Sequence, residues 1–282
     1  MNSRLVFSGH ETFHCKNLWL KKGYDFVSNK GKFTDEACID LGVGRNMVSS
    51  IRFWLKSFDI IDKKDEEITK VAEFIFNDEN GKDKYLESET TLWLLHYLLV
   101  TQNHSSIYSL IFSHFRKIKP EFDKVNFISY AISLDSKLNT NTLGKDFSVF
   151  LRTYYSKNVK DVEDSFSGLL SDLSLVHEIK REKESKFYIQ NKNADSIAPE
   201  LILYAILENK NYGKSINFKS LFSDFNSVGN VFAFTQDQLE KKLIEVANEF
   251  EGIIYTNDAG IKELQFKKQK PNSLKILEKC YG

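Results

Sequence analysis

The sequence contains few prolines, which interrupt helices, and few cysteines, which cross-link secreted domains. It has 3 cysteines and 3 prolines in 282 residues, and its 39 basic and 39 acidic side chains leave a net charge of zero. Cys15, Cys38 and Cys280 are widely spaced, an odd and sparse set that indicates a reducing cytoplasm and buried thiols. So few prolines, beside 41% hydrophobic residues, favour packed helices and argue against disorder.

Long apolar runs and familiar catalytic motifs are also absent. The most apolar stretch, residues 91–100, is much shorter than the ~20 residues of a membrane span, so no membrane contact is expected. The start, MNSRLVFSGHETF, has no apolar h-region, so we expect no signal peptide and a cytoplasmic protein. Phosphate-binding, dinucleotide-binding and nucleophile-elbow patterns are missing. We therefore expect no cofactor and no familiar enzyme, and an enzyme with an unfamiliar site stays open.

What is present centres on residues 33–61, which have the pattern of a helix, a glycine turn, a second helix and a strand. Thr34 suits the start of the first helix, and Gly42 allows the left-handed backbone of a sharp turn. After the turn, apolar residues recur at helical spacing: Met47, Val48, Ile51, Trp54, Leu55 and Phe58. Residues 59–62 are predicted to be a strand, 63–66 a wing tip and 68–76 the returning strand. The pattern predicts a winged helix-turn-helix over residues 1–84.

The opposite side of the second helix carries hydrogen-bond donors suited to DNA. We predict that it contacts double-stranded DNA through Arg45, Asn46, Ser49, Arg52 and Lys56. Arg45 and Asn46 would lie near base edges, and Arg52 and Lys56 on phosphates. Phe53 on the same side favours the alternative that this surface docks a protein, since exposed aromatic residues often anchor protein contacts. A helical pair that only packs inside a larger fold is the remaining interpretation.

The charge is segregated along the chain although it sums to zero. Residues 1–34, 179–192 and 262–279 are basic, whereas residues 59–89 are acidic. For contact with phosphates, local basic patches matter more than the net charge of the chain. The basic tail, residues 262–279, is therefore a second candidate nucleic-acid contact. The alternative is that these patches are solvated faces of alternating sign.

A zinc motif is matched formally near the N-terminus. His10, Glu11 and His14 fit H-E-x-x-H, in which two histidines one helical turn apart bind zinc. Only nine residues precede His10, and no third ligand is evident, so we predict no metal site. We expect His10 and Glu11 to form local hydrogen bonds that tie the N-terminus to the winged helix. A functional surface of unknown chemistry is the alternative role for this pair.

The rest of the chain predicts a helical middle and a mixed C-terminal region. Residues 85–160 contain predicted helices at 85–99, 105–117, 123–134 and 143–157. In residues 161–282 we predict a helix at 162–173, strands at 175–179 and 186–190, and a hairpin at 252–266. Pro199 opens a helix there, and Thr235 with Gln238 forms a capping box. The predicted fold class is mainly α with small β-wings (α+β), ending in a C-terminal winged-helix-like region.

Four segments in order carry a family resemblance: FSGHETF, NLWLKKGYDFV, LGVGRNMVSSIRFWLKSF and YLESETTLWLLHYLL. With them, the chain resembles a bacterial family catalogued as domain of unknown function 4007, and the similarity runs its length. His14 departs from the family pattern, which further weakens the zinc interpretation. The resemblance implies companions among ATPases and PAPS-reductase-like sulfurtransferases of phage-defence and DNA-phosphorothioation gene clusters. It assigns no catalytic residues.

Together these observations predict a DNA-binding accessory subunit of a bacterial anti-phage defence or DNA-modification system of the phosphorothioation type. The first alternative is a docking scaffold for an ATPase or sulfurtransferase partner. The second is a stand-alone transcriptional regulator, which would dimerise on a palindromic site.

Overall fold

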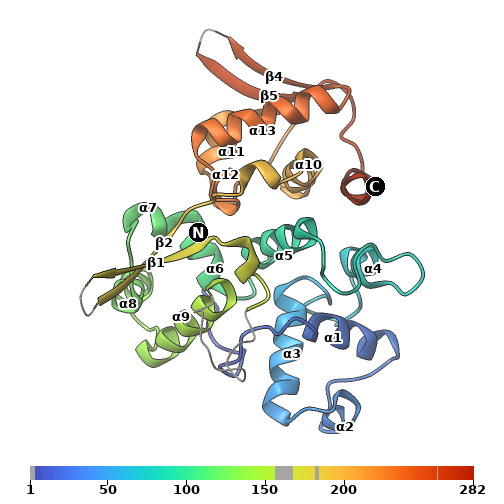
Figure 1. The fold of residues 1–282 in the computed structure, drawn as a ribbon, viewed down its shortest axis with the longest axis vertical. Coiled ribbons are helices and arrows are strands. Elements are labelled where there is room, and N and C mark those ends of the chain that lie inside the picture. Colours follow the sequence, from blue (N-terminus) through green and yellow to red (C-terminus); the bar gives the residue numbers. More distant parts are fainter. Residues whose placement is uncertain (1–3, 156–167, 182–183, 259) are drawn as a thin grey trace. The chain divides into compact units, whose positions relative to one another are not determined.

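The computed structural model describes residues 4–155, 168–181, 184–258 and 260–282 (Figure 1). These residues are roughly half helical and include two small antiparallel sheets, so the predicted α+β class, mainly α with small β elements, is confirmed. The chain divides into two compact units, residues 1–189 (unit 1) and 190–282 (unit 2). This division is coarser than the three predicted ranges 1–84, 85–160 and 161–282, which stay a prediction.

Unit 1 begins with four helices, drawn in blue and cyan in Figure 1: α1 Trp19–Ser28, α2 Ala37–Leu41, α3 Arg45–Ser57 and α4 Lys70–Phe76. Helix α1 contacts the other three, and α2 also contacts α3. The apolar spacing that predicted α3 is confirmed, because Val48, Ile51, Trp54 and Leu55 are buried. The expected Thr34 cap is wrong: α2 starts only at Ala37, whose N–H donates to the Thr34 carbonyl in a preceding turn (3.1 Å).

The predicted returning wing strand at residues 68–76 is also wrong. Thr69 caps a helix there, its hydroxyl accepting from the Ala72 N–H (3.2 Å), and α4 buries apolar residues at helical spacing. The wing is reduced to one antiparallel bridge between Ile61 and Ile68, closed by a hydrogen bond from the Asp62 N–H to the Glu67 carbonyl (2.8 Å). Residues 62–67 therefore form a turn beside α3 in place of a two-stranded wing.

The middle of unit 1 is helical, as predicted. It contains α5 Glu89–Thr101, α6 Ser106–Leu110, a π-helical turn Ile111–Phe115, α7 Arg116–Ile118, α8 Lys124–Leu134 and α9 Thr140–Tyr154. Large aromatic side chains fill the space among these helices. His96 of α5 lies against Phe112 (ring centroids 4.7 Å) and hydrogen-bonds the Tyr154 hydroxyl of α9 (2.7 Å). This core holds α9, which contacts the N-terminal segment described below, in a fixed position.

The two strands predicted at 175–179 and 186–190 form a hairpin that lies within unit 1. Strands β1 Val176–Arg181 and β2 Glu184–Ile189 pair antiparallel after a 3₁₀ turn at Ser171–Leu173. The backbone of Phe187 in β2 exchanges two hydrogen bonds with Phe122 (2.8 and 2.7 Å), and its ring packs against Phe147 and Tyr155. These contacts hold the hairpin in unit 1. The first half of the predicted helix at 162–173 lies outside the described residues, which resume at 168.

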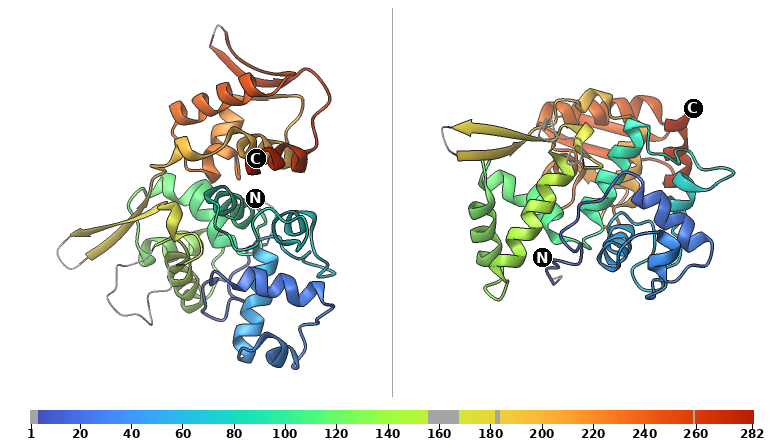
Figure 2. Two further views of the ribbon diagram at one scale, coloured as in Figure 1. Left: turned by 45° about the vertical axis from the view of Figure 1, so that its right-hand side comes forward. Right: turned by 60° about the horizontal axis from the view of Figure 1, so that its bottom comes forward.

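Unit 2 has its own elements: a 3₁₀ turn Ala194–Ser196, α10 Pro199–Glu208, β3 Ser215–Asn217, α11 Phe218–Ser223, α12 Val228–Val231, α13 Gln236–Glu249, β4 Ile253–Asp258, β5 Ile261–Phe266, α14 Ser273–Glu278 and a 3₁₀ turn Lys279–Tyr281. The strands form one sheet in the order β3-β5-β4, and α13 lies along β4 (Figure 2). The predicted hairpin, the capping box of Thr235 with Gln238 and the Pro199 helix start are confirmed.

None of the helices formed by the described residues combines the length and the apolar character that crossing a bilayer requires.

Candidate nucleic-acid interface

The turn between α2 and α3 sets the direction in which α3 projects. Gly42 ends α2 in the left-handed conformation (φ +58°), and the Val43 N–H donates back to the Cys38 carbonyl (3.1 Å). A Cβ atom at Gly42 would meet nothing within 4 Å, so the backbone conformation, not lack of space, favours glycine there. Gly44 then precedes the first turn of α3 in an extended conformation.

The exposed side of α3 carries four of the five predicted DNA-contacting residues. Arg45, Asn46, Ser49 and Arg52 are all exposed, and they lie within the first two turns of the helix. Their spacing of one, three and three residues places them along one side of a helix with 3.6 residues per turn. The structure therefore brings these four donors together on one accessible surface.

Lys56, the fifth predicted residue, is largely covered. Only 14% of its side chain is exposed, and its ammonium group lies 2.5 Å from Glu66 Oε1 and 3.2 Å from the Lys63 carbonyl. Arg52 binds the same carboxylate oxygen through Nε (2.8 Å) and Nη2 (2.5 Å). Burial by itself would raise the pKa of Glu66, but hydrogen bonds from Arg52 and Lys56 outweigh it and lower that pKa. Glu66 thus binds both of the residues that were predicted to contact phosphates.

Phe53 is buried, so its predicted place on the exposed side of α3 is wrong. Its ring lies 5.7 Å from the ring of His10 and 5.1 Å from that of His104, and a Cβ atom at Gly9 would come within 2.7 Å of it. The cause is the N-terminal segment, residues 8–13, which covers this side of the helix. Because Phe53 is not exposed, it no longer supports protein docking at α3.

His10 ties that N-terminal segment to two helices. Its carbonyl accepts from the Ser50 hydroxyl of α3 (3.0 Å), and its ring Nε2 lies 3.0 Å from Asp146 Oδ1 of α9. Both side chains are buried, with 4% and 1% exposed. The Thr12 N–H donates to His10 Nδ1 (3.1 Å), so Nε2 carries the proton given to Asp146. His10 therefore holds the N-terminus as predicted, but through Asp146, which the sequence did not reveal.

Glu11 does not share this buried site, because its side chain is exposed. Glu11 and Thr12 have left-handed backbones (φ +47° and +66°), and residues 10–14 form a turn and not a helix. His10 and His14 are thus not presented one helical turn apart, as a zinc protease requires. Among the described residues, no group of three or more His, Cys, Asp or Glu side chains is placed to hold a metal ion.

A groove runs beside α3, between the loop after α1 and the turn at 62–67. It is lined by Val27, Lys30, Gly31, Lys32, Phe33, Thr34, Arg52, Lys64, Asp65, Glu66 and Glu67. Arg52 lies over the Phe33 ring (5.8 Å to its centroid) while it binds Glu66, so its guanidinium is held at the wall of the groove. The exposed lysines at positions 30, 32 and 64 extend the basic surface of α3.

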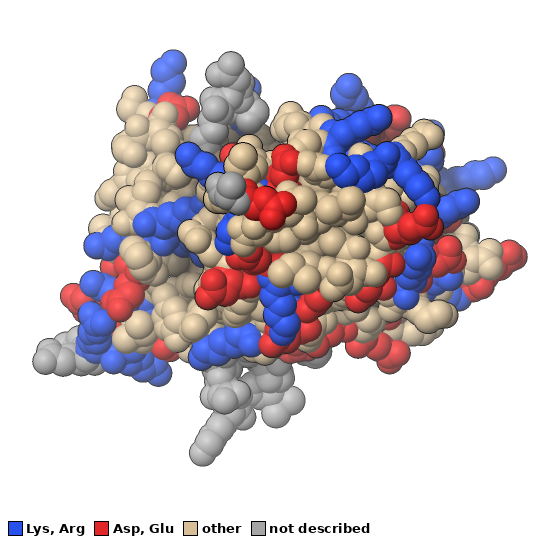
Figure 3. Space-filling model, turned by 90° about the horizontal axis from the view of Figure 1, so that it is seen from above, with Lys and Arg blue, Asp and Glu red and all other residues tan. Residues whose placement is uncertain are grey.

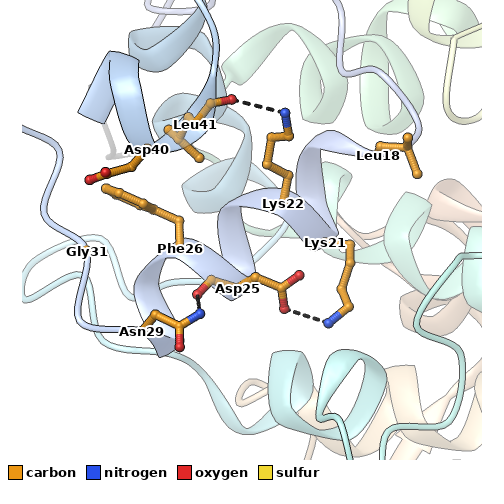
Figure 4. A pocket seen from close by; sticks show the side chains of 9 residues that line it. All are labelled: Leu18, Lys21, Lys22, Asp25, Phe26, Asn29, Gly31, Asp40 and Leu41. Atoms are coloured by element: carbon orange, nitrogen blue, oxygen red, sulfur yellow. Dashed lines mark hydrogen bonds and ion pairs between the residues drawn. The ribbon is translucent and has the colours of Figure 1, made fainter. Parts of the chain in front are cut away.

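A second hollow lies between α1 and α2 (Figure 4). Its basic side chains are used within the fold: the Lys22 ammonium group donates to the Leu41 carbonyl at the end of α2 (3.0 Å), and Lys21 pairs with Asp25 (2.5 Å). The Lys22 hydrogen bond therefore links α1 to α2, and this hollow offers fewer available donors than the groove.

Charge is distributed differently elsewhere in the molecule. On the face shown in Figure 3, Lys and Arg side chains are interspersed with Asp and Glu. In unit 2, both lysines of α13 are paired: Lys241 with Asp195 (2.7 Å) and Lys242 with Glu245 (2.8 Å). The basic hairpin residue Lys262 likewise pairs with Glu240 (2.6 Å). We take the start of α3 and its groove as the candidate nucleic-acid surface, because Lys30, Lys32 and Lys64 are exposed there.

These features define a mainly helical α+β protein of two compact units, with a basic helix surface and groove in the first. The chain belongs to the family described as protein of unknown function (DUF4007), whose model matches residues 7–281. Two solved structures named SspB, one of them magnesium ion-bound, are similar in fold, with TM-scores of 0.84 for the magnesium-bound structure and 0.83 for the other. Each is 23% identical and covers 99% of this chain and 88% of its own. A comparison with curated proteins found no match.

Proposed function

We propose that this protein is a DNA-binding accessory subunit of a bacterial anti-phage defence or DNA-modification system of the phosphorothioation type. The observation that carries the proposal is the exposed start of α3, where Arg45, Asn46, Ser49 and Arg52 share one side of a helix. Arginine and asparagine can each form paired hydrogen bonds with guanine and adenine edges in the major groove. The defence or modification context rests on the family resemblance.

The arrangement of α2, the glycine turn and α3 supports a helix-turn-helix interpretation of residues 16–76. In this proposal α3 enters the major groove by its N-terminal turns, and residues 62–67 replace the wing. In unit 2 the elements follow one another as α10, β3, α11, α12, α13, β4 and β5, and the strands pair in the order β3-β5-β4. We interpret this order as a winged helix in which α13 takes the place of α3.

Unit 2 itself favours a second function, the docking of a protein partner. Both lysines of helix α13 are paired with carboxylates, whereas Ile244 on the same helix is 45% exposed. The hairpin beside it exposes Ile254 and Ile261 (42% and 65%). Apolar side chains at these positions suit a protein contact better than a phosphate backbone. The family resemblance implies an ATPase or a PAPS-reductase-like sulfurtransferase as the partner.

One of the two similar structures is described as magnesium ion-bound. In this chain, among the residues that the structure describes, no group of three or more His, Cys, Asp or Glu side chains is placed to hold a metal ion.

The experiment that tests DNA binding is a fluorescence-anisotropy titration of duplex DNA with the full chain at about 50 and 200 mM salt. We expect the wild-type affinity to fall steeply with salt, and Arg45→Ala/Asn46→Ala to bind at least about tenfold more weakly, because each paired base contact contributes ~1–3 kcal/mol. The matched control is Asn141→Ala/Lys145→Ala, which removes one amide and one exposed charge from α9. Absence of wild-type binding at low salt would refute the proposal.

A further inference from the structure

The groove beside α3 contains exposed lysines and one carboxylate, Glu66, that is already paired with Arg52 and Lys56. Lys30, Lys32 and Lys64 line it, all three are exposed, and none of them forms an ion pair with a described residue. Three ammonium groups along a groove are suited to a run of backbone phosphates. The residues come from two separate segments, one before α2 and one after α3, that the fold brings to the same side of α3.

Glu66 is the feature that sets this groove apart from an ordinary basic surface. Its carboxylate accepts from both the guanidinium of Arg52 and the ammonium group of Lys56, with one oxygen 2.5 Å from each. Its side chain is only 23% exposed, so the three groups form a compact cluster at the groove wall. A guanidinium binds carboxylate and phosphate with the same fork geometry, so the two anions compete for one site on Arg52.

We propose that this groove is the site for the DNA backbone beside α3, and that Glu66 occupies the place of a phosphate when DNA is absent. In this arrangement Lys30, Lys32 and Lys64 bind phosphates directly. Arg52 and Lys56 become available only when a phosphate displaces the Glu66 carboxylate. This inference rests on the proposed DNA binding, and it adds three contact residues and one competing group to it.

The competition predicts that removing the Glu66 charge strengthens DNA binding. We expect Glu66→Gln to bind duplex DNA up to about fivefold more tightly than wild type at about 100 mM salt, since an ion pair to a partly exposed side chain such as Arg52 contributes up to ~1 kcal/mol. Glu67→Gln is the matched control, because Glu67 lines the same groove and is exposed but forms no ion pair with a described residue. Equal tightening in both variants would show a general charge effect and overturn the role of Glu66, as would unchanged affinity in Glu66→Gln.

The direct phosphate contacts are tested separately by the salt dependence. Lys30→Gln/Lys32→Gln/Lys64→Gln should reduce the slope of log affinity against log salt by about 2.7, which is ~0.9 for each phosphate that is no longer neutralised. The control Lys119→Gln/Lys137→Gln/Lys145→Gln removes three exposed lysines from the α7–α9 part of unit 1 and should leave the slope nearly unchanged. An unchanged slope in the groove variant would overturn the inference.

The proposed function and the groove inference fail in different ways. If wild type binds no DNA at low salt, the proposed function fails, and the inference with it. If wild type binds and loses affinity in Arg45→Ala/Asn46→Ala, but neither the groove variant nor Glu66→Gln changes binding, the proposed function stands and the inference fails. Far-UV circular dichroism melting of each variant shows that a change in affinity does not arise from unfolding.

Discussion

At the residue scale, His104 shows how the covered side of α3 changes the chemistry of a side chain. Its ring packs against Phe53 (5.1 Å) under the N-terminal segment. Burial, and then the positive charges of Lys63 and Lys56, lower the pKa of His104 from 6.5 to about 4. The two lysines are held nearby because Lys56 binds Glu66 and Lys63 donates to the Gln102 carbonyl.

This shift predicts a pH dependence of stability with a definite sign. In the unfolded chain His104 takes up a proton below about pH 6.5, whereas in the folded protein it does so only near pH 4. The unfolded state therefore binds more protons between these values, and the free energy of unfolding falls as the pH is lowered through this window. We expect His104→Gln to make the fall shallower between pH 6.5 and 4 in urea denaturation. A slope equal to that of wild type would contradict this account.

At the element scale, the N-terminal segment acts as a strap between helices. Residues 8–13 lie against α3 through Ser50 and Trp54, whose indole N–H donates to the Phe13 carbonyl (3.1 Å). The same segment meets α9, where Asp146 accepts from the Ser8 N–H (3.0 Å) and from His10, and Arg152 donates to the Thr12 carbonyl (2.5 Å). The strap thereby fixes the buried side of α3 and leaves its basic side exposed.

We expect substitutions of the adjacent residues His10 and Glu11 in this N-terminal segment to change the free energy of unfolding by different amounts. His10→Ala should lower the free energy of unfolding by about 3 kcal/mol, because it removes a partner from the buried Asp146 carboxylate. Glu11→Gln should change it by less than about 0.5 kcal/mol, since that side chain is exposed. Chemical denaturation measures both values. Similar costs for the two variants would contradict the structural role assigned to His10.

Whether a helix or strand was predicted correctly from the sequence has a physical explanation at this scale. The Gly42 turn, the Thr235 capping box and Pro199 at a helix start gave correct boundaries, because each acts through its own backbone neighbours. Thr34 is an equally local signal but did not cap α2, because a preceding turn delays the helix to Ala37. The wing prediction failed at residues 68–76, where apolar residues are dense enough to suit a strand or a helix equally well. The Thr69 cap and the burial of one side against α1 favoured the helix.

At the scale of the whole molecule, the chain forms two units with separate cores. Unit 2 buries Leu201, Ile206, Leu221, Leu243 and Leu264 among its own helices and sheet. Its three strands are paired with one another and with no described strand of unit 1. A unit with its own core and complete strand pairing has what independent folding requires.

We therefore expect residues 190–282 to fold as a separate fragment. Calorimetry should show one cooperative transition with an enthalpy of roughly 65 kcal/mol, at ~0.7 kcal/mol per residue. A matched fragment that starts at residue 215 lacks α10 and should melt without a cooperative transition, because α10 contacts α12, α13 and α14. Gradual melting of the 190–282 fragment would contradict its independence.

The α+β class, the position of α3 and its donor-rich start could all be predicted from the sequence, because helical spacing and glycine conformation are local properties. Of the two roles weighed for His10 and Glu11, the hydrogen bonds of His10 fit the tying down of the N-terminus, whereas Glu11 is exposed. Three further features emerged only from the folded chain: Asp146 is the partner of His10, Phe53 is buried, and Glu66 holds Arg52 and Lys56. Asp146 lies 136 residues from His10 in the chain, and Glu66 lies 14 residues from Arg52. Packing sets the approach of such distant segments, so it cannot be inferred from the spacing within one helix.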